Sequence, residues 1–311
     1  MKDKRTIVCI VLIMVGLLMS LVTLVAIGFE LEKLLDATEN TVEIKESFNS
    51  IAINLEETDV TIKPSTDGKC TLYTKCKDSV TVKYTVENGE LKIEGETDTF
   101  TDLFTIGGNS MILYLPKDAY KNLKILGSTG DVSLSQIDFE SGEIDVSTAD
   151  VTIDSNVAKL NVKVSTGDIS ISGLTGESAA LKASTGDVFI KDSTFSGEIK
   201  LEGKTSDVKM KNVNVLSIEA EVSTGDIELE GVIATKEMKL KASTGDIELV
   251  RCDAEEMELK TSSGDVEGVL NTSKVFYVIT KSGHVSVPRS NKGGLCQVTT
   301  SSGDIEFRIV E

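Results

Sequence analysis

Tryptophan is absent from this sequence, histidine occurs once, and aromatic residues make up only 5% of it. Carbohydrate-binding platforms usually expose large aromatic side chains, so this scarcity argues against one. A metal site at His284 would lack a second nitrogen ligand, and no zinc-ligand spacing occurs in the chain. No convincing Ser/His or Cys/His catalytic set can be assembled around a single histidine either.

Basic residues are scarce as well. The first five residues hold three of the 32 Lys and Arg and one of the 50 Asp and Glu. The rest of the chain therefore carries 29 basic and 49 acidic side chains, a net charge of −20. Such an acidic surface repels nucleic acid and anionic lipid headgroups and favours cations or basic partners. We expect no binding to nucleic acid.

Five cysteines are few, and odd in number, for an exported protein. Cys9 lies in the apolar N-terminal run, and Cys252 and Cys296 fall in different repeat units. If Cys70 and Cys76 share a strand, they lie about 20 Å apart, too far for a disulfide. We expect small, partly buried thiols without a disulfide framework.

The N-terminal run predicts a membrane anchor. Residues 6–29 contain no charged side chain; as a helix they would span roughly 36 Å, enough to cross a hydrocarbon core of about 30 Å. A cleaved signal peptide would have a shorter apolar region. The basic residues in segment 1–5 predict a cytoplasmic tail, with residues 30–41 as a juxtamembrane linker and the remainder outside the cell.

A nine-residue stretch recurs in the exported part: KASTGDVFI at 182–190 returns as KASTGDIEL at 241–249. Related copies give ten units at steps of 18 to 20 residues. They end on Asp131, Asp150, Asp168, Asp187, Asp207, Asp226, Asp246, Asp265, His284 and Asp304. Constant spacing leaves no unit room for its own core, so the units must stack.

Apolar and polar residues alternate within each unit, which is the period of a strand. Leu160, Val162 and Val164 precede one corner, and Ile169 and Ile171 follow it. A two-strand unit can bury such a face only against the units above and below it. The sequence predicts an all-β, single-stack parallel β-solenoid of about 19 to 20 residues per coil, with successive units stacked on one another. Parallel crossovers favour a right-handed coil.

The recurring Gly and Asp are interpreted as a structural corner. Gly would supply a positive φ, the Ser and Thr hydroxyls would satisfy backbone groups, and Asp would accept from backbone N–H groups. Ala149 and Ser206 replace the Gly, and His284 replaces the Asp, without disturbing the period. The predicted corner residues are Gly130, Asp131, Asp150, Gly167, Asp168, Gly186, Asp187, Asp207, Gly225, Asp226, Gly245, Asp246, Gly264, Asp265, Gly303 and Asp304.

Residues 42–125 are less regular, and we expect an N-terminal β region there, ahead of the regular repeats of residues 126–311. A related corner at Asp59 marks the first coil. Asn88-Gly89 predicts a β-hairpin, which would cap the open edge of that coil. The C-terminal unit has no comparable cap. We expect it to end the stack, either as a docking edge or blunted by Glu306, Arg308 and Glu311.

Taken together, these features resemble the bacterial putative-adhesin family. The resemblance rests on the anchor, an F-x-x-I-x-I pattern at Phe48, Ile51 and Ile53, a Y-L-P step at 114–116, and the recurrent corners. It covers roughly residues 42–311. The resemblance implies a β-solenoid domain of unknown function in a surface protein of the bacterial cell membrane. It also implies adhesion, sometimes a link to envelope-stress sensing, and no catalytic residues.

Stacked corners would place their aspartates about 4.8 Å apart, where like charges repel by roughly 1 kcal/mol in water. Corner hydrogen bonds, splayed side chains or bound cations would relieve this repulsion. The later units add Glu two residues after Asp, which suggests a weak Ca²⁺ site on the outer face. Its ligands would be Asp226, Glu228, Asp246, Glu248, Asp265 and Glu267. A solvated acidic face is the simpler alternative, and no other cofactor is expected.

No unit carries an insertion long enough to build a catalytic cleft. We therefore expect a non-enzymatic cell-surface binding protein, an adhesin-like scaffold that presents a rigid acidic rod. Its partner would be an extracellular protein or a component of the cell envelope. An accessory or sensor protein of an envelope-stress system is the main alternative. A polysaccharide-acting β-helix enzyme is the least favoured of the three.

Overall fold

The computed structural model describes residues 37–77, 80–97 and 108–310. These ranges contain 25 β-strands and no helix, which confirms the all-β prediction. None of the described segments is therefore a helix able to cross a membrane. The predicted anchor at residues 6–29 lies outside the described residues.

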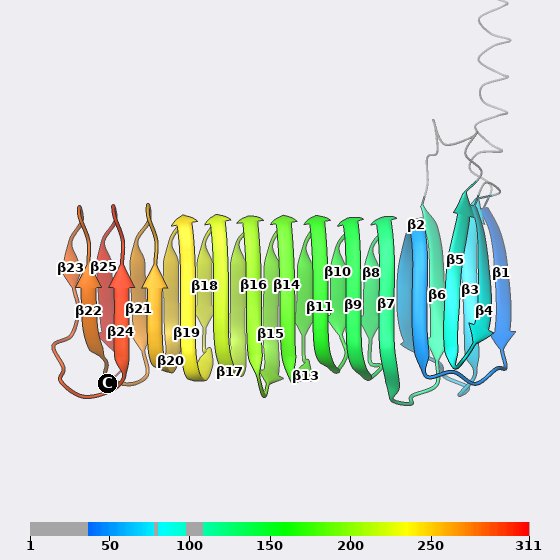
Figure 1. The fold of residues 1–311 in the computed structure, drawn as a ribbon, viewed down its shortest axis with the longest axis horizontal. Helices are drawn as coiled ribbons and strands as arrows, with labels where there is room; N and C mark the ends of the chain where they lie inside the picture. Colours follow the sequence, from blue (N-terminus) through cyan, green and yellow to red (C-terminus); the bar gives the residue numbers. More distant parts are fainter. Residues whose placement is uncertain (1–36, 78–79, 98–107, 311) are drawn as a thin grey trace, which may run out of the picture.

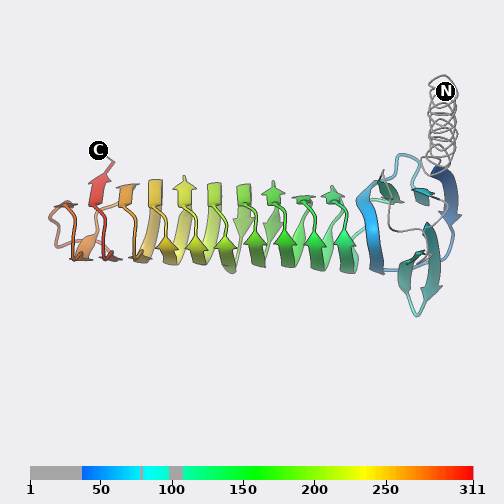
Figure 2. The same cartoon turned by 90° about the horizontal axis from the view of Figure 1, so that it is seen from above.

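The strands form one parallel β-solenoid, in which each coil has a long strand, a tight corner and a short strand (Figure 1). In one coil these are β11 (Val157–Thr166) and β12 (Ile169–Ser172). β11 pairs in parallel with β9 (Phe139–Thr148) on one side and β14 (Ser178–Thr185) on the other. Seen from above, the coils lie as parallel slices along a rod (Figure 2).

The remaining strands of the regular coils fall into three groups. Other long strands are β7 (Tyr120–Thr129) and β16 (Glu198–Thr205). Other short strands are β8 (Val132–Ser135), β10 (Val151–Asp154), β18 (Ile227–Glu230) and β21 (Val266–Leu270), with β13 (Thr175–Gly176) on the return side. Strands that continue round a bend are β2 (Ser50–Pro64), β15 (Val188–Phe195), β17 (Val208–Thr224), β19 (Ile233–Thr244) and β20 (Ile247–Lys260).

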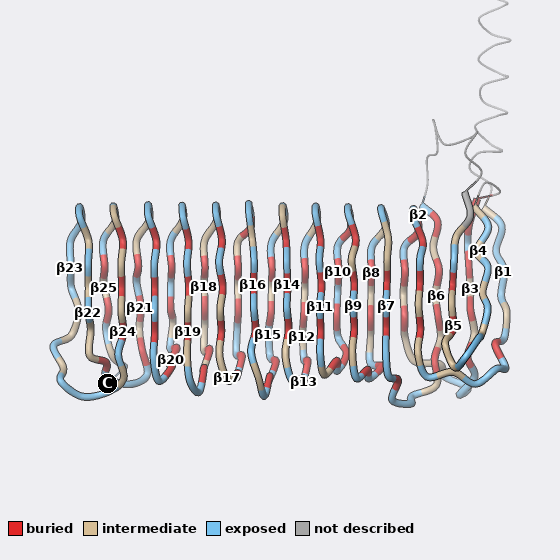
Figure 3. Tube along the Cα trace, viewed as in Figure 1, coloured by how far each residue is buried: buried red, intermediate tan, exposed pale blue. Residues whose placement is uncertain are grey.

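The core is a single apolar column that runs the length of the rod. Leu160, Val162 and Val164 point inward from β11, whereas Asn161 and Lys163 between them are exposed. Because the register is parallel, Val162 lies between Ile144 and Leu181 of the adjoining coils. Figure 3 shows the resulting alternation of buried and exposed residues along each strand. Burial against neighbouring coils, rather than within one coil, therefore stabilises every unit.

Antiparallel strands lie at the N-terminal end, and a capping role for them stays a prediction. The strands are β1 (Ala37–Ile44), β3 (Cys70–Lys77), β4 (Val80–Glu87), β5 (Glu90–Thr97) and β6 (Asn109–Leu115). β4 and β5 form the predicted hairpin at Asn88-Gly89, and β5 pairs in parallel with the first half of β2. β6 pairs with the second half of β2, and β3 joins β6 to β1. β1 begins at Ala37, inside the segment that the sequence assigned to a linker.

The C-terminal coils do not stack in sequence order, contrary to the prediction. β24 (Leu295–Thr299) pairs with β20 on one side and with β22 (Val275–Ile279) on the other. β25 (Ile305–Ile309) likewise lies between β21 and β23 (Val285–Ser286). The last coil in the sequence is therefore internal, and the coil before it ends the rod. Figure 1 shows the red strands β24 and β25 between orange neighbours.

Two glycines make this reversal sterically feasible. A side chain at Gly293, whose φ is 98°, would place its Cβ 1.7 Å from the Ser273 carbonyl oxygen. At Gly294 the Cβ would lie 1.7 Å from the Glu255 carbonyl oxygen. Only glycine lets the chain pass this closely between residues 255 and 273 and return to the slot beside β20. The prediction that the last coil of the sequence ends the stack as a bare edge is thus wrong, since its residues Cys296, Val298 and Ile305 are fully buried.

Replacing a corner glycine should damage the stack more than it strains the local backbone. In Gly186→Ala the new Cβ would lie 2.1 Å from the Gly167 carbonyl oxygen, at a φ of 126°. We expect a loss of about 2–4 kcal/mol of stability from strain and overpacking together. Gly68→Ala is the control, because Gly68 has a φ of 74° but no atom within 4 Å; it should cost about 1 kcal/mol. Thermal unfolding followed by circular dichroism compares the two, and equal losses would contradict the stacking argument.

Candidate functional site

The corner aspartates form a continuous hydrogen-bonded ladder along one edge of the rod. In each coil the aspartate Oδ1 accepts a hydrogen bond from the backbone N–H of the corner residue in the next coil. The N–H of Asp207, for example, donates to Asp187 over 2.9 Å. Donors are Asp131, Asp150, Asp168, Asp187, Asp207, Asp226, Asp246, Asp265, Asp304 and His284, at 2.6–2.9 Å. The predicted corner aspartates are thereby brought into one row.

The ends of the ladder show the order of the coils. Asp59 of β2 accepts from Asp131, so the first coil lies 72 residues earlier in the chain than the second. At the other end Asp304 donates to Asp265 and accepts from His284. His284 therefore ends the row.

The predicted corner glycines carry φ values between 126° and 154°, a range that L side chains rarely adopt. Each would place a Cβ within 2.4 Å of a backbone atom in the adjoining coil. Ala149 and Ser206 take the equivalent positions without a positive φ, and the ladder continues through Asp150 and Asp207. The glycines thus allow close stacking, and the aspartates satisfy the N–H groups where the strands stop.

The expected role of the corner hydroxyls is seen at some corners only. Ser206 donates its hydroxyl to the Ala183 carbonyl over 3.4 Å, and Thr261 and Thr300, which precede their corners, donate to the carbonyls of Gly245 and Gly264 over 3.0 and 3.2 Å. Corner threonines accept hydrogen bonds from the glycine N–H groups through their backbone carbonyls, as Thr205 does from Gly186 over 3.2 Å. Their exposed hydroxyls form a straight row beside the ladder, with no hydrogen bond to a described residue. The row comprises Thr129, Thr148, Thr166, Thr185, Thr205, Thr224 and Thr244.

The glutamates proposed as cation ligands also fall into one row. Glu228, Glu248 and Glu267 lie opposite one another on successive coils. Glu306, which is not in the proposed set, continues the row although it is 39 residues beyond Glu267. The aspartates of the proposed set are used in the ladder, and Glu228 is paired with Lys209 over 3.1 Å. Among the described residues, no three His, Cys, Asp or Glu side chains gather so that they could hold a metal ion. The Ca²⁺ hypothesis therefore has no assembled ligand set.

Ion pairs between coils occupy much of the long-strand face. They include Lys124 with Glu143 at 3.3 Å, Lys163 with Asp145 at 2.8 Å, Lys182 with Glu202 at 2.8 Å, Lys200 with Glu219 at 3.4 Å, and Lys241 with Glu221. All are solvent-exposed, so each contributes little to stability, about 0–1 kcal/mol. Their effect is to hold outer side chains in regular rows.

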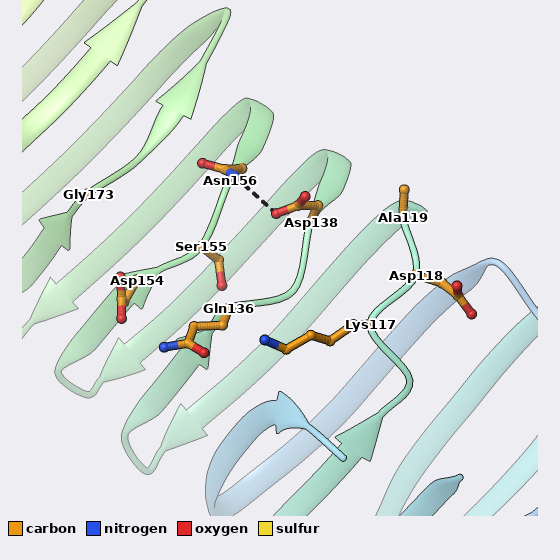
Figure 4. Close-up of a pocket in the computed structure, with 9 residues that line it drawn as sticks. All are labelled: Lys117, Asp118, Ala119, Gln136, Asp138, Asp154, Ser155, Asn156 and Gly173. Carbon is orange, nitrogen blue, oxygen red and sulfur yellow. Dashed lines mark hydrogen bonds between the residues drawn. The ribbon is translucent and has the colours of Figure 1, made fainter. Parts of the chain in front are cut away.

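An open groove of about 540 Å³ lies on the return side near the N-terminal end (Figure 4). Three of its polar side chains bond to neighbouring coils. Asn156 donates to Asp138 over 3.1 Å and accepts from the backbone of Thr175. Ser155 accepts from the N–H of Ile137 over 3.2 Å. The groove is lined by Lys117, Asp118, Ala119, Gln136, Asp138, Asp154, Ser155, Asn156 and Gly173. This arrangement satisfies backbone groups and does not pair a nucleophile with a base.

All four cysteines of the described part are free and buried, in agreement with the sequence. Cys70 and Cys76 lie on the same strand, β3. Burial raises the pKa of Cys70 and Cys296 to about 12 and that of Cys252 to about 11. The thiols are therefore protonated and unreactive near neutral pH.

The sequence reasoning missed the outermost coil, which β22 and β23 form. β22 is apolar throughout, with the sequence VFYVI, and its Tyr277 and Ile279 are exposed. The apolar run at residues 275–279, which breaks the alternation of the other strands, could have indicated this coil. A strand that is apolar on both faces needs a partner on its outer face as well as on its inner face.

The family model described as Toastrack DUF4097 matches residues 48–250 and 196–311, and so nearly all of the solenoid. The chain belongs to the Toastrack DUF4097 family. This membership confirms the resemblance seen in the sequence, a β-solenoid family of unknown function. No curated protein matches this Toastrack chain.

Several solved structures resemble it over most of their length. A putative adhesin from Parabacteroides distasonis has 14% identity and a TM-score of 0.49, covering 87% of this chain and 96% of its own. A putative adhesin from Bacteroides fragilis has 16% identity and a TM-score of 0.43, covering 87% and 97%. A putative lipid binding protein from P. distasonis has 16% identity and a TM-score of 0.46, with the same coverage. Identities and TM-scores this low say nothing about what this chain binds.

The ladder predicts a difference between two substitutions of Asp187. Asp187→Ala removes the acceptor for the Asp207 N–H, and we expect it to cost about 1–3 kcal/mol. Asp187→Asn keeps an oxygen acceptor and should cost less than about 1 kcal/mol. Melting temperatures measured in EDTA and in Ca²⁺ test this. A loss in Asp187→Asn as large as in Asp187→Ala, seen only with Ca²⁺, would show a cation-binding role instead.

The buried thiols predict a loss of stability at alkaline pH. Burial raises the pKa of Cys252 from its ordinary value of 9.0 to about 11, so the folded state holds the proton more tightly than the unfolded chain. Its contribution is fully present below pH 9 and is lost as pH rises toward 11, by about 2 kcal/mol. Urea unfolding at pH 8 and pH 11 should show a smaller decline for Cys252→Ala than for the parent. Equal declines would refute the assignment to this thiol.

Proposed function

We propose that this Toastrack protein is a non-enzymatic binding scaffold on the bacterial surface, adhesin-like in its mode of action. The supporting observation is the alignment of outer side chains into straight rows along the rod. The threonine hydroxyls, the four stacked glutamates and the ion pairs of the long-strand face each repeat from coil to coil. A ligand that meets such a surface encounters many equivalent groups at a fixed spacing, which favours multivalent contact.

Several features support a scaffold over a polysaccharide-acting enzyme. The corner carboxylates accept from backbone N–H groups, and three side chains of the groove, Asp138, Ser155 and Asn156, bond to neighbouring coils. His284 is exposed on the outermost coil, and its backbone N–H continues the ladder. These groups hold neighbouring coils together, and a catalytic role would require them to break those hydrogen bonds.

The proposal includes the orientation expected from the sequence. Residues 6–29 anchor the chain in the cell membrane, residues 1–5 stay in the cytoplasm, and the solenoid stands outside. The hairpin of β4 and β5, together with β1, β3 and β6, caps the membrane-proximal end of the stack. The partner is an extracellular protein or a component of the cell envelope.

Site-specific photocrosslinking on intact cells tests the scaffold function. A photoreactive side chain is placed at Glu219 on the long-strand face, at Glu248 on the short-strand face, or at buried Val162 as a control. We expect crosslinked species of defined mass from at least one exposed position and none from Val162. Labelling of the Gly68→Cys variant on intact cells by a membrane-impermeant thiol reagent checks that the solenoid lies outside the cell.

Two results would overturn the proposal. One is the absence of crosslinks from both exposed faces in cells that display the protein. The other is cleavage of cell-wall polysaccharide by the purified chain, lost on substitution of side chains that line the groove, such as Asp138→Asn.

A further inference from the structure

The C-terminal end of the rod differs in charge from the rest of the rod. Residues 268–303 contain no Asp or Glu, but they contain Lys274, Lys281, Arg289 and Lys292. Of the 32 Lys and Arg in the chain, these four leave 28, against all 50 Asp and Glu. An acidic rod thus ends in a basic tip, made by β22, β23 and the loop of residues 287–294.

Three of the four cations of the tip are free to meet a ligand. Lys281, Arg289 and Lys292 are exposed, and none forms an ion pair with a described residue. Lys274 is different, because it is buried and bonded to Asp253 and to the Ala254 carbonyl, each at 2.5 Å. It fixes the chain where the outermost coil departs from the stack.

Exposed apolar side chains gather at the same end. The large hydrophobic residues that are exposed in the described part of the chain all belong to the two last coils. Tyr277 is 55% exposed and Ile279 43% exposed, on the outer face of β22. On the inner face Phe276 packs against Phe307, with ring centroids 5.2 Å apart. Figure 3 shows β22 and β23 mostly in the colours of partial and full exposure.

The outermost coil also leaves a strand edge open. β22 pairs only with β24, and β23 only with β25, so along their other edge the backbone groups have no strand partner among the described residues. Open edges are usually blunted by charged side chains or proline. β22 carries neither. An unblunted edge with apolar side chains on both faces is suited to accept another strand.

We propose that β22 binds an extended acidic segment of a partner protein, which adds to the solenoid as a further strand. This deepens the scaffold function proposed above and rests on it. The backbone edge requires a polypeptide, because only another strand offers matching N–H and C=O groups. Tyr277 and Ile279 favour alternate apolar side chains on that segment. The cations favour acidic residues at its ends, since Lys281 follows β22 and Lys292 lies in the loop that returns beside its start.

A second copy of the chain fits this end less well. Joining two tips by a two-fold axis would bring like charges together at the contact. The opposite end of the rod does not supply the acids, because Glu39 and Glu43 of its edge strand β1 are paired with Lys75 and Lys69. An anionic lipid surface would match the cations but would leave the strand edge unpaired.

Peptide binding to the full-length chain in detergent tests the proposal. The probe is a fluorescent ten-residue peptide of alternating Val and Thr with two Glu at each end. One control peptide carries Lys instead of Glu, and another carries Pro at alternate positions. Vesicles of phosphatidylglycerol form a separate arm. Binding is followed by fluorescence anisotropy, and strand addition by hydrogen exchange of residues 275–279.

We expect the Glu peptide alone to bind and to slow exchange in β22. Ile279→Glu should raise its dissociation constant by about tenfold or more, or 1.4 kcal/mol. Thr299→Glu is the matched control, because Thr299 lies opposite Ile279 on the internal strand β24 and places the same charge one strand away. It should change the dissociation constant by less than about twofold, while Lys281→Glu with Lys292→Glu should weaken binding.

Three outcomes would overturn this inference. They are no binding of the Glu peptide at millimolar concentration, binding of the proline peptide as tight as that of the Glu peptide, and a chain that binds the vesicles but not the Glu peptide. If crosslinks still form at Glu219 or Glu248 on cells, the scaffold function stands and only the edge site falls. If those crosslinks are absent too, both proposals fall.

Discussion

A carboxylate oxygen that reaches one coil further along the rod and accepts a backbone N–H is the interaction on which this architecture depends. At each tight corner the N–H groups before and after the aspartate still donate to carbonyls of the adjoining coil, but the N–H of the aspartate itself has no backbone acceptor there. The aspartate of the neighbouring coil accepts the unpaired N–H at 2.6–2.9 Å, and the glycine before it lets the two backbones approach. The same bond also offsets the repulsion expected between stacked aspartates, because each carboxylate receives a donor.

Repetition of this corner explains the outer surface. A unit that is too long or too short would move its aspartate away from the next N–H, which accounts for steps of 18 to 20 residues. Parallel register then places equivalent residues of successive coils side by side, whether they are threonines, glutamates or ion pairs. The rows that support a scaffold function thus follow from the same constraint as the fold. At the two ends of the stack there is no further coil to match, and there the chain departs from the repeat.

Much of the architecture was predictable from residues alone. Alternation in segments such as Leu160–Val164 predicted parallel stacked strands, Asn88-Gly89 predicted the hairpin, and the spacing of Cys70 and Cys76 excluded a disulfide. The role of the corner hydroxyls was predicted only in part. Ser206, Thr261 and Thr300 donate to backbone carbonyls, whereas the exposed threonines of the row do not, because sequence does not show which backbone groups the next coil already pairs. The row formed by Glu267 and Glu306 was also hidden, since the two residues are 39 positions apart.

By itself the sequence determined the repeat, the inward and outward faces, and the type of corner, because these depend on residues a few positions apart. Only the tertiary structure decided which coil ends the rod. The units around Asp265, His284 and Asp304 have nearly the same spacing and polarity, so local pattern cannot rank their order in space. Close passage at Gly293 and Gly294, the buried Lys274–Asp253 pair and the packing of Phe276 on Phe307 select it. Each of these contacts joins residues of different coils and exists only once the coils have stacked.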